Sequence, residues 1–236
     1  MASLLKVPLI LLSAIMLQVS FTPPNVPSSN EIVHQTLNEW VLTRLQRYGL
    51  PVMKAIYWVI SFAEIATIAC CTTNSLSTIC AIAQHAIGQR IRDTPITFPF
   101  ILGTALAVAG GLIRWWCFRT LGRYFTFQLS VRKGHRIVTT GPYAVIRHPS
   151  YTAAMIQMIG ILILHGSPTS WLRRSGVLNI PGLKLVATAW LAQTAIFTIQ
   201  TIGRVSQEDE VLKSAFGDDW EKWAKVVRYR LIPGVY

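Results

Sequence analysis

The sequence has few charged residues for its length. Asp, Glu, Lys and Arg together make up 14% of its 236 residues, whereas a soluble domain carries about a quarter. Hydrophobic residues make up 52%, and the mean hydropathy is +0.42. This composition excludes an ordinary water-soluble domain and predicts an integral membrane protein.

Acidic residues are especially scarce. Ten of them stand against 22 lysines and arginines, so the formal net charge is +12. The basic residues lie in short clusters beside apolar runs, without the long basic helix or the aromatic-interleaved sheet motif that reads nucleic acid. Anionic lipid headgroups explain these clusters better. We therefore expect the lipid bilayer as a partner, and no nucleic acid.

Two motifs that hold metals and dinucleotides are also missing. The four cysteines, Cys70, Cys71, Cys80 and Cys117, have neither CxxC spacing nor nearby histidines suited to zinc, so we expect no metal site. We interpret them as small buried hydrophobes, without a disulfide framework. No G-x-G-x-x-G turn follows a strand, which excludes a Rossmann domain. Any cofactor must then be held by membrane helices and their cytosolic ends.

Several apolar runs approach or reach the length of a membrane span. They cover residues 4–21, 51–71, 97–118, 150–164 and 184–202. The first resembles a signal peptide, but it lacks a small-x-small cleavage site, and we expect it to be retained. The last two form a hairpin whose turn contains Pro168 and Pro181. The predicted fold is an all-α integral membrane protein with about five transmembrane helices.

Two stretches between these runs are less apolar. Residues 25–48 carry apolar side chains at helical spacing among charged ones, which predicts an amphipathic helix at the membrane interface. Residues 72–89 are moderately apolar and are interrupted by Asn74 and Ser75. They suit a surface or re-entrant segment, and we do not count them as a span.

A few residues inside the runs stand out. Glu64 is costly in lipid, so we expect it to be satisfied by a polar group on another helix. Arg114 lies near the end of its run and is expected to snorkel towards water. Gly103, Gly110 and Gly111 offer close approach between helices.

Two polar segments rich in lysine and arginine are predicted to face the cytosol. They are the loop 119–149 and the tail 203–236, which two apolar runs separate, so the parity of crossings places them on one side. The chain divides into amino-terminal membrane helices, residues 1–96, and a catalytic membrane core, residues 97–236, that carries the loop and a helical tail. No repeat or low-complexity linker separates the two, so we expect one structural domain.

The loop ends in an unusual concentration of reactive side chains. Between Gly134 and Tyr151 the sequence has two histidines, two arginines, two tyrosines and the turn-forming steps Gly-Pro and His-Pro. Pro149 biases His148 away from helix, and it suits the first position of the next helix. The amides at such a helix start can bind a carboxylate, for example that of an amino-acid cofactor.

A second cluster follows the last run. Arg204 and Glu208 are four residues apart and share one helix face, followed by Asp209 and Glu210. Two interpretations are open: an intrahelical salt bridge followed by a solvated acidic patch, or a pair that faces the loop.

These motifs together resemble a known family. The run Gly141-Pro-Tyr-x-x-x-Arg-His-Pro-Ser-Tyr151, the acidic stretch leading to Phe216-Gly217, and a final Arg230-Leu-Ile-Pro-Gly234 are similar to the isoprenylcysteine carboxyl methyltransferases. The resemblance covers about residues 111–236. Phospholipid methyltransferases share parts of the pattern, so the loop alone leaves the substrate class open.

The resemblance implies a cofactor, a substrate and a location. It implies S-adenosyl-L-methionine (SAM) as the methyl donor and proteins with a carboxyl-terminal prenylated cysteine as partners, at the endoplasmic reticulum membrane with the site facing the cytosol. Arg204 would bind the substrate, and Arg204, Glu208 and His148 are the candidate catalytic residues. The cofactor-binding residues would be Gln128, His135, Arg136, Ile137, Val138, Tyr143, His148, Pro149, Ser150, Tyr151 and Glu208.

Elementary chemistry agrees with a carboxylate as the methyl acceptor. An α-carboxyl group, with a pKa of roughly 3.5, is already ionised at neutral pH and needs no general base. An arginine such as Arg204 can hold one carboxylate oxygen and leave the other free to attack. A phospholipid amine would first have to lose a proton, which favours a base over an arginine. Phospholipid N-methylation and a non-catalytic lipid-binding protein remain the alternatives. For His148 two roles are open, a general base or a cofactor or structural contact, and we favour the contact.

Overall fold

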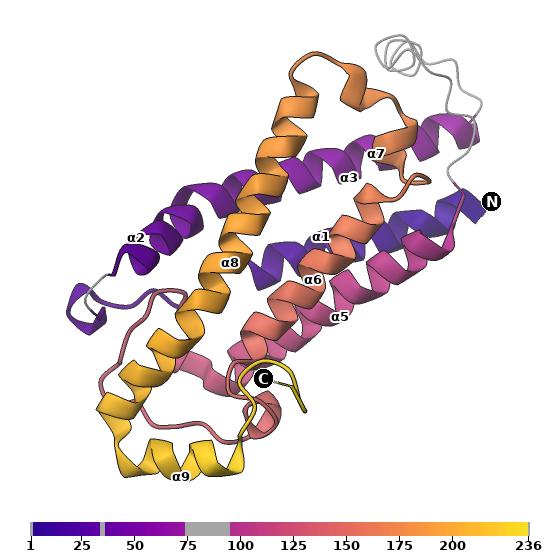
Figure 1. Cartoon of the computed structure of the whole chain (residues 1–236). Helices are drawn as coiled ribbons and strands as arrows, with labels where there is room; N and C mark the ends of the chain where they lie inside the picture. Colours follow the sequence, from indigo (N-terminus) through magenta and orange to yellow (C-terminus); the bar gives the residue numbers. More distant parts are fainter. Residues whose placement is uncertain (1, 34–35, 74–94, 236) are drawn as a thin grey trace. The chain divides into compact units, whose positions relative to one another are not determined.

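The computed structural model describes residues 2–33, 36–73 and 95–235, and every regular element in these ranges is helical (Figure 1). The α-helices are α1 (Lys6–Ser20), α2 (Leu37–Arg44), α3 (Leu50–Thr73), α5 (Phe98–Leu121), α6 (Pro149–Gly166), α7 (Trp171–Arg174), α8 (Leu183–Phe216) and α9 (Asp218–Val226). A π turn, Leu45–Gly49, joins α2 to α3. Short 3-10 turns cover Ala2–Leu5, Ser29–Glu31, Gly122–Tyr124, Gly141–Ala144 and Val177–Asn179. Ile32 and Ser130 form one isolated antiparallel bridge.

The predicted multi-pass helical fold is confirmed. Four described helical stretches are long and apolar enough to cross a membrane: Leu37–Cys70, Phe98–Tyr124, Pro149–Arg174 and Leu183–Phe216. The first apolar run forms α1, which has 15 residues and a length of roughly 22 Å, less than the hydrocarbon thickness of about 30 Å. The predicted spans 51–71, 97–118 and 150–164 match α3, α5 and α6 within a few residues.

Two boundaries differ from the prediction. The amphipathic helix predicted over residues 25–48 begins only at Leu37, where the Thr36 side chain accepts a hydrogen bond from the Glu39 amide at 3.3 Å. It continues into α3 through the π turn, because Pro51 has no N–H to complete the ordinary helical ladder. The last span continues as α8 to Phe216, so the polar residues after 202 extend the same helix. The ambiguous segment 72–89 lies almost wholly outside the described residues.

The described chain forms two compact units. One contains Met1–Gln18, Val52–Ala109 and Ile156–Ala192, and the other contains Val19–Pro51, Gly110–Met155 and Gln193–Tyr236. The boundary expected between residues 96 and 97 falls inside the first unit. That the chain forms one structural domain stays a prediction.

In the first unit, glycines bring α5 and α6 together. A Cβ atom on Gly160 would lie 2.4 Å from the Ala107 nitrogen and 2.7 Å from the Gly103 oxygen. A Cβ atom on Gly103 would lie 2.7 Å from the Leu164 nitrogen. The neighbours are backbone atoms, which cannot move aside as a flexible side chain would. The close approach predicted for Gly103 is therefore confirmed.

The same unit satisfies the charge expected to be costly in lipid. The Lys6 ammonium lies 2.7 Å from the Glu64 carboxylate, and the two side chains are 3% and 5% exposed. The ammonium also lies 4.4 Å from the centre of the Phe100 ring. Apolar side chains of Ile10, Ile68, Phe100 and Leu164 form a cluster in this unit. The polar partner predicted for Glu64 thus comes from α1.

In the second unit, Arg114 corrects its predicted role. It is 4% exposed and does not snorkel. Its guanidinium donates to the Ser20 carbonyl at 2.6 Å and to the carbonyl and hydroxyl oxygens of Ser150 at 2.9 and 2.7 Å. Phenylalanine rings surround it, with centres 5.1 to 6.0 Å away: Phe21, Phe118, Phe125 and Phe127. Because all these partners are available, the guanidinium stays inside and ties α5 to the first turn of α6.

The cysteines follow their predicted interpretation only in part. Cys117 is free and buried, as expected. Cys70 is disulfide-bonded, which corrects the view of all four as simple hydrophobes. Bond formation depends on two sulfur atoms meeting in space, which the spacing in the sequence did not indicate.

The close contact between α5 and α6 yields the first prediction. Replacing Gly160 with Ala should lower the free energy of unfolding by about 1–3 kcal/mol, because the new methyl group meets backbone atoms. Thermal unfolding in detergent measures this change. Gly166→Ala is the control, since a Cβ atom there meets nothing within 4 Å, and equal stability of the two variants would contradict the assigned contact.

Candidate active site

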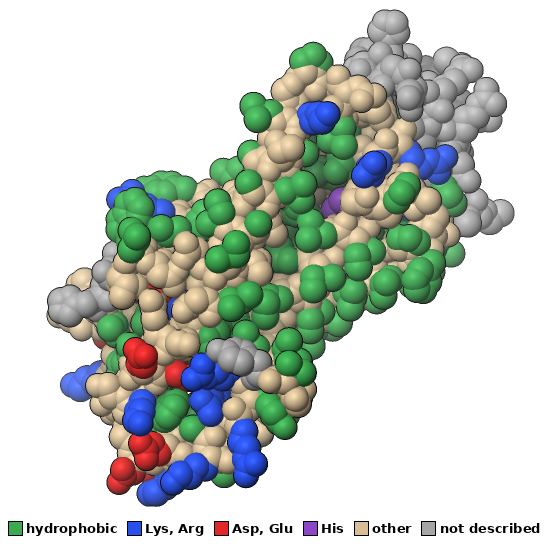
Figure 2. Space-filling model, viewed as in Figure 1, with side chains coloured by type: hydrophobic (Ala, Val, Ile, Leu, Met, Phe, Trp, Pro, Cys, Tyr) green, Lys and Arg blue, Asp and Glu red, His purple; other side chains and the backbone are tan. Residues whose placement is uncertain are grey.

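The second unit contains a cavity that is open to solvent. Its wall is built by the loop after α5, the first turn of α6, the last turns of α8, and α9. Figure 2 shows charged side chains of both signs gathered at the end of the molecule formed by α9 and the end of α8. The cavity therefore lies in the most polar part of the chain.

Residues predicted to bind the cofactor surround this cavity. All of them except Pro149 line it: Gln128, His135, Arg136, Ile137, Val138, Tyr143, His148, Ser150, Tyr151 and Glu208. Pro149 is instead the first residue of α6, where its fixed backbone angle suits the helix start. Arg204 also lines the cavity. The structure brings these residues together, and their individual roles stay predictions.

Sequence reasoning missed several lining residues. They are Leu121, Tyr124, Phe125, Thr126, Leu129, Ser130, Arg147, Val211, Leu212, Phe216 and Trp223. Part of this set had a readable signal. Arg204 and Glu208 start a helical stripe that continues with Leu212 and Phe216 at steps of four residues, so one face of α8 lines the cavity.

An aromatic group forms one wall. The His135 ring stacks on Tyr124, with centres 4.6 Å apart and planes 6° apart, and it meets the Phe216 ring edge to face at 5.2 Å. The Tyr124 hydroxyl donates to the Gly134 carbonyl at 2.6 Å, which fixes the turn before His135. Burial lowers the pKa of His135. Its Nδ1 atom is buried without a hydrogen-bond partner in the described part of the chain, so it is available to a ligand.

The first turn of α6 meets α8 on another wall. The Tyr151 hydroxyl donates to the Glu208 carboxylate at 2.5 Å. His148 Nδ1 lies 3.8 Å from the same carboxylate, and its ring stacks on Tyr151 with centres 5.5 Å apart and planes 4° apart. Burial raises the pKa of Tyr143, also in this cavity, well above its usual value. The wall thus presents one carboxylate whose position is held by a phenol.

Asp209 connects this wall to the carboxyl-terminal segment. It is 3% exposed, and its carboxylate lies 3.1 Å from each of His148 Nε2, Arg147 Nη1 and Arg230 Nε. The solvated acidic patch considered from sequence is therefore wrong for Asp209, whereas Glu210 is exposed. Three positively charged or protonatable groups around one carboxylate explain why it can be buried.

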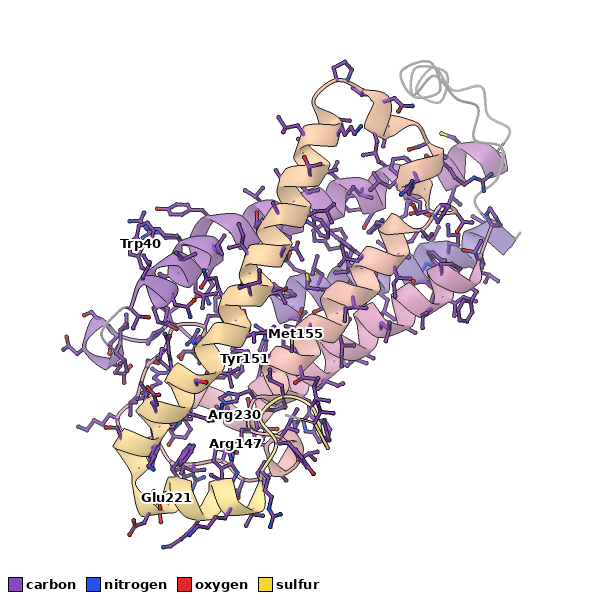
Figure 3. All side chains as sticks on the ribbon, in the orientation of Figure 1. Trp40, Arg147, Tyr151, Met155, Glu221 and Arg230 are labelled. Atoms are coloured by element: carbon purple, nitrogen blue, oxygen red, sulfur yellow. The ribbon has the colours of Figure 1, made fainter. Side chains whose placement is uncertain are left out.

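Arg147 holds the carboxyl-terminal segment by several further hydrogen bonds. Its guanidinium donates to the carbonyl oxygens of Val227 at 2.9 Å and Ala224 at 3.2 Å. The backbone N–H groups of Arg147 and His148 donate to the Tyr229 and Arg230 carbonyls, both at 2.9 Å. In Figure 3, Arg147 and Arg230 lie near each other beside the end of the chain. The segment after α9 is thus attached to the residues that open α6.

Arg204 pairs with a residue that the sequence did not single out. It is 4% exposed, and its Nε lies 3.0 Å from Glu39 Oε1 on α2. Its Nη1 donates to the Phe127 carbonyl. The intrahelical bridge to Glu208 considered from sequence does not form among the described residues. The Nε and Nη1 atoms of the guanidinium therefore face protein groups. Because Arg204 also lines the cavity, part of its positive charge remains available to a ligand.

The model of the Isoprenylcysteine carboxyl methyltransferase (ICMT) family matches residues 102–180. The resemblance to this family is confirmed. The matched stretch contains most of α5, the cavity loop and α6, and thus includes His135 and the motif ending at Tyr151.

Curated relatives cover similar parts of the chain. Protein-S-isoprenylcysteine O-methyltransferase B of Arabidopsis thaliana is 26% identical over 127 residues, 53% of this chain and 55% of that protein. Protein-S-isoprenylcysteine O-methyltransferase of Schizosaccharomyces pombe is 34% identical over 95 residues, 40% and 32%. Delta(14)-sterol reductase of Neurospora crassa is 27% identical over 125 residues, 46% and 25%. The matches thus span about a quarter to just over half of these relatives. No solved structure matches.

The contacts of Asp209 yield a prediction about stability. Asp209→Ala leaves the Arg147 and Arg230 guanidinium groups without their shared carboxylate, which should cost about 3–5 kcal/mol in the free energy of unfolding. Thermal unfolding in detergent measures the loss, and limited trypsin digestion should cut faster after Arg228. Asp219→Ala is the control, because that side chain is 81% exposed. Equal digestion rates of the two variants would rule out the proposed attachment.

The half-buried His135 ring yields a prediction about pH. Its pKa is lowered in the folded chain, so below a pH of about 6.5 the unfolded chain binds the proton more readily. The contribution of His135 to folding is therefore constant above that pH and becomes increasingly unfavourable as the pH falls towards the folded-state pKa. Melting temperatures between pH 8 and 5 should decline less in His135→Gln than in the natural protein. Parallel curves would show that His135 does not cause the dependence.

Proposed function

We propose that this chain is a membrane-bound methyltransferase that uses SAM to methylate the α-carboxylate of a carboxyl-terminal prenylated cysteine. The observation that carries the proposal is the buried Arg204 guanidinium in the wall of the cavity whose loop resembles and matches the ICMT family. A cation there suits an anionic acceptor. The names of the plant and yeast relatives support the same acceptor class.

The cavity residues fit the proposed cofactor. The Tyr124, His135 and Phe216 rings offer flat apolar surfaces for a purine, and the unpartnered His135 Nδ1 offers a polar contact to it. The Glu208 carboxylate suits a cationic amino group. When bound, SAM would supply an electrophilic methyl group on a sulfonium.

The residues of the chain would act by orientation rather than by proton transfer. A carboxylate with a pKa of roughly 3.5 is ionised before it binds, so no group here needs to remove a proton. Arg204 would hold the carboxylate at the cavity wall. Alignment of two bound reactants contributes at most about 7 to 11 kcal/mol to lowering a barrier. Water exclusion adds to this, because a desolvated carboxylate is a better nucleophile.

His148 is assigned a positioning role. Its Nε2 faces the Asp209 carboxylate at 3.1 Å, and its ring is stacked on Tyr151. The imidazole is thus engaged on one edge and one face by protein groups. This arrangement suits orientation of Tyr151 and Glu208 in the cofactor wall, and the reaction requires no base from it.

The proposal extends to location and partners. The substrate joins a protein carboxyl terminus to an isoprenoid, so the enzyme must meet it at a membrane surface, and exposed apolar side chains on α8 such as Ile199, 67% exposed, suit contact with lipid. We assign the cavity to the cytosolic face of the endoplasmic reticulum membrane, where proteins processed at a carboxyl-terminal CAAX sequence would be the partners. Methylation would remove a negative charge beside the lipid anchor and strengthen membrane binding.

One observation favours a second candidate. Relatives named Delta(14)-sterol reductase match 46% of this chain, a share that lies between those of the Schizosaccharomyces pombe (40%) and Arabidopsis thaliana (53%) methyltransferases. A reductase must accept a hydride donor and an uncharged sterol, and neither needs a buried arginine at the acceptor position. Arg204 therefore favours the methyltransferase.

Methyl transfer from radiolabelled SAM to N-acetyl-S-farnesylcysteine tests the proposal. Membranes that contain the chain should release label as base-labile methanol, and Arg204→Ala and Glu208→Ala should each lower the rate about 100-fold or more. Asp219→Asn, an exposed acid replaced by its amide, should retain the full rate.

Three other outcomes would contradict it. Labelled choline-type lipids without ester would indicate phospholipid N-methylation. Reduction of a sterol double bond without methyl transfer would indicate the second candidate. Absence of SAM binding altogether would favour a non-catalytic lipid-binding protein.

A further inference from the structure

Glu39 is a buried carboxylate in the second unit. It lies in the first turn of α2 and is 4% exposed. It precedes the stretch that matches the ICMT family, residues 102–180, and the cavity wall does not include it. An acid without a role would not stay buried at this point, because desolvating a carboxylate is costly. The contacts of Glu39 indicate its role.

The segment that carries Glu39 is attached to the cavity loop. Asn25 donates to the carbonyls of Gly122 and Phe125 at 2.9 and 3.0 Å. Two backbone hydrogen bonds of 3.0 Å run between the segment and the loop, from Val33 to Leu129 and from Val131 to Glu31.

Side-chain contacts extend this attachment. Gln46 donates to the Phe127 carbonyl at 3.2 Å. The Glu39 carboxylate accepts a backbone hydrogen bond from Leu129. It is therefore fixed against both the loop and α8.

Glu39 and Phe127 together restrict the Arg204 guanidinium. Glu39 Oε1 lies 3.0 Å from Nε, as an ion pair whose angle is not that of a hydrogen bond. Phe127 accepts a hydrogen bond from Nη1. A bidentate carboxylate needs two neighbouring N–H groups of the planar fork. Nη1 keeps one further N–H, but the Nε edge is covered by the Glu39 carboxylate, so the side-on pair of Nε and Nη2 is closed to a two-oxygen contact.

This restriction matters for the transfer of a methyl group to a carboxylate. A carboxylate held by both oxygens is strongly stabilised before reaction, and its lone pairs are engaged, so tight binding does not accelerate the chemical step. A contact through one oxygen orients the group and leaves the other oxygen free to attack. The negative charge of Glu39 also offsets the Arg204 charge that attracts the acceptor.

We infer that Glu39 is a positioning residue that denies the acceptor carboxylate the side-on, two-oxygen contact with Nε and Nη2 of Arg204 and so favours a contact through one oxygen. The inference rests on the proposed function, because it assumes that Arg204 meets the carboxylate of a prenylcysteine. On this inference, the segment around Glu39 belongs to the active site, although it precedes the residues that match the ICMT family. Glu39 acts through Arg204 and touches neither reactant.

Binding of two matched ligands tests this role without reliance on turnover. N-acetyl-S-farnesylcysteine has the carboxylate, and its methyl ester lacks that charge. In Glu39→Gln, which keeps the shape and removes the charge, the acid should bind about tenfold more tightly relative to the ester than in the natural protein. The affinity for the ester should stay unchanged. Asp219→Asn, the same acid-to-amide change at an exposed site, should leave the ratio as it is.

Kinetics give a second, independent readout. Glu39→Gln should lower both KM and kcat for the acid, each by about tenfold, because tighter ground-state binding is not matched in the transition state. A higher KM with an unchanged kcat, or an unchanged ratio of acid to ester affinity, would overturn the inference. Glu39→Asp retains the negative charge but moves it away from the Nε atom of Arg204, because the side chain is shorter. This variant should also raise the affinity for the acid relative to the ester, by a smaller factor than Glu39→Gln.

Folding and the proposed function are separated by further controls. SAM binding by Glu39→Gln and Glu39→Asp reports whether the cavity is intact, and the inference is then decided on whichever variant binds SAM. Loss of SAM binding in both variants would overturn a positioning role and make Glu39 a folding residue. If the natural protein methylates the acid and the ratio does not change, only this inference fails. If the natural protein neither binds nor methylates it, the proposed function fails as well.

Discussion

The constraint that shapes this chain is the cost of placing charge away from water. In the described residues, each deeply buried charge is met by partners from a different part of the sequence: Lys6 by Glu64, Arg114 by two serines and an aromatic group, Arg204 by Glu39, and Asp209 by Arg147, His148 and Arg230. Removing either member of such a set exposes the other to an apolar surrounding. In the second unit these ion pairs therefore do more than add stability. They fix which segments must be assembled before the cavity exists.

The cavity is consequently built from groups held on more than one side. Glu208 is contacted by Tyr151, and its neighbour Asp209 is attached to the loop and to the carboxyl-terminal segment. Arg204, one turn earlier, is attached to α2. Three residues within two turns of α8 thus connect this helix to four other segments of the second unit: the first turn of α6, the loop, the carboxyl-terminal segment and α2. A ligand that bridges Arg204 and Glu208 would meet side chains whose positions are already set, which lowers the entropy cost of alignment.

Much of the fold and part of the cavity could be predicted from local sequence patterns. Apolar run length gave α3, α5 and α6 within a few residues, since a span needs about 20 apolar residues whatever surrounds it. The Gly134–Tyr151 motif gave one side of the cavity, because unusual side chains gather there in sequence as well as in space.

Contacts between residues that are far apart in the sequence could not be predicted in this way. Glu39 and Arg204 are far apart in the chain, and nothing in the spacing of either signals the other. Arg114 was expected to reach water because its position near a helix end allows it, and only the surrounding rings and serines show that it is retained inside. The start of α2 at Leu37 follows a local cap by the Thr36 side chain, whereas the bridge between Ile32 and Ser130 joins residues far apart in the sequence.

The length of α8 has a mechanical consequence. Its 34 residues rise roughly 51 Å, about 20 Å more than the hydrocarbon core of a bilayer. Arg204 and Glu208 therefore lie on the same continuous helix as the last apolar stretch, with no loop between that stretch and the two side chains. The part of α8 that extends beyond the hydrocarbon core depends on the thickness of the bilayer. Membrane thickness thus becomes a variable that affects how far these two side chains lie from the lipid.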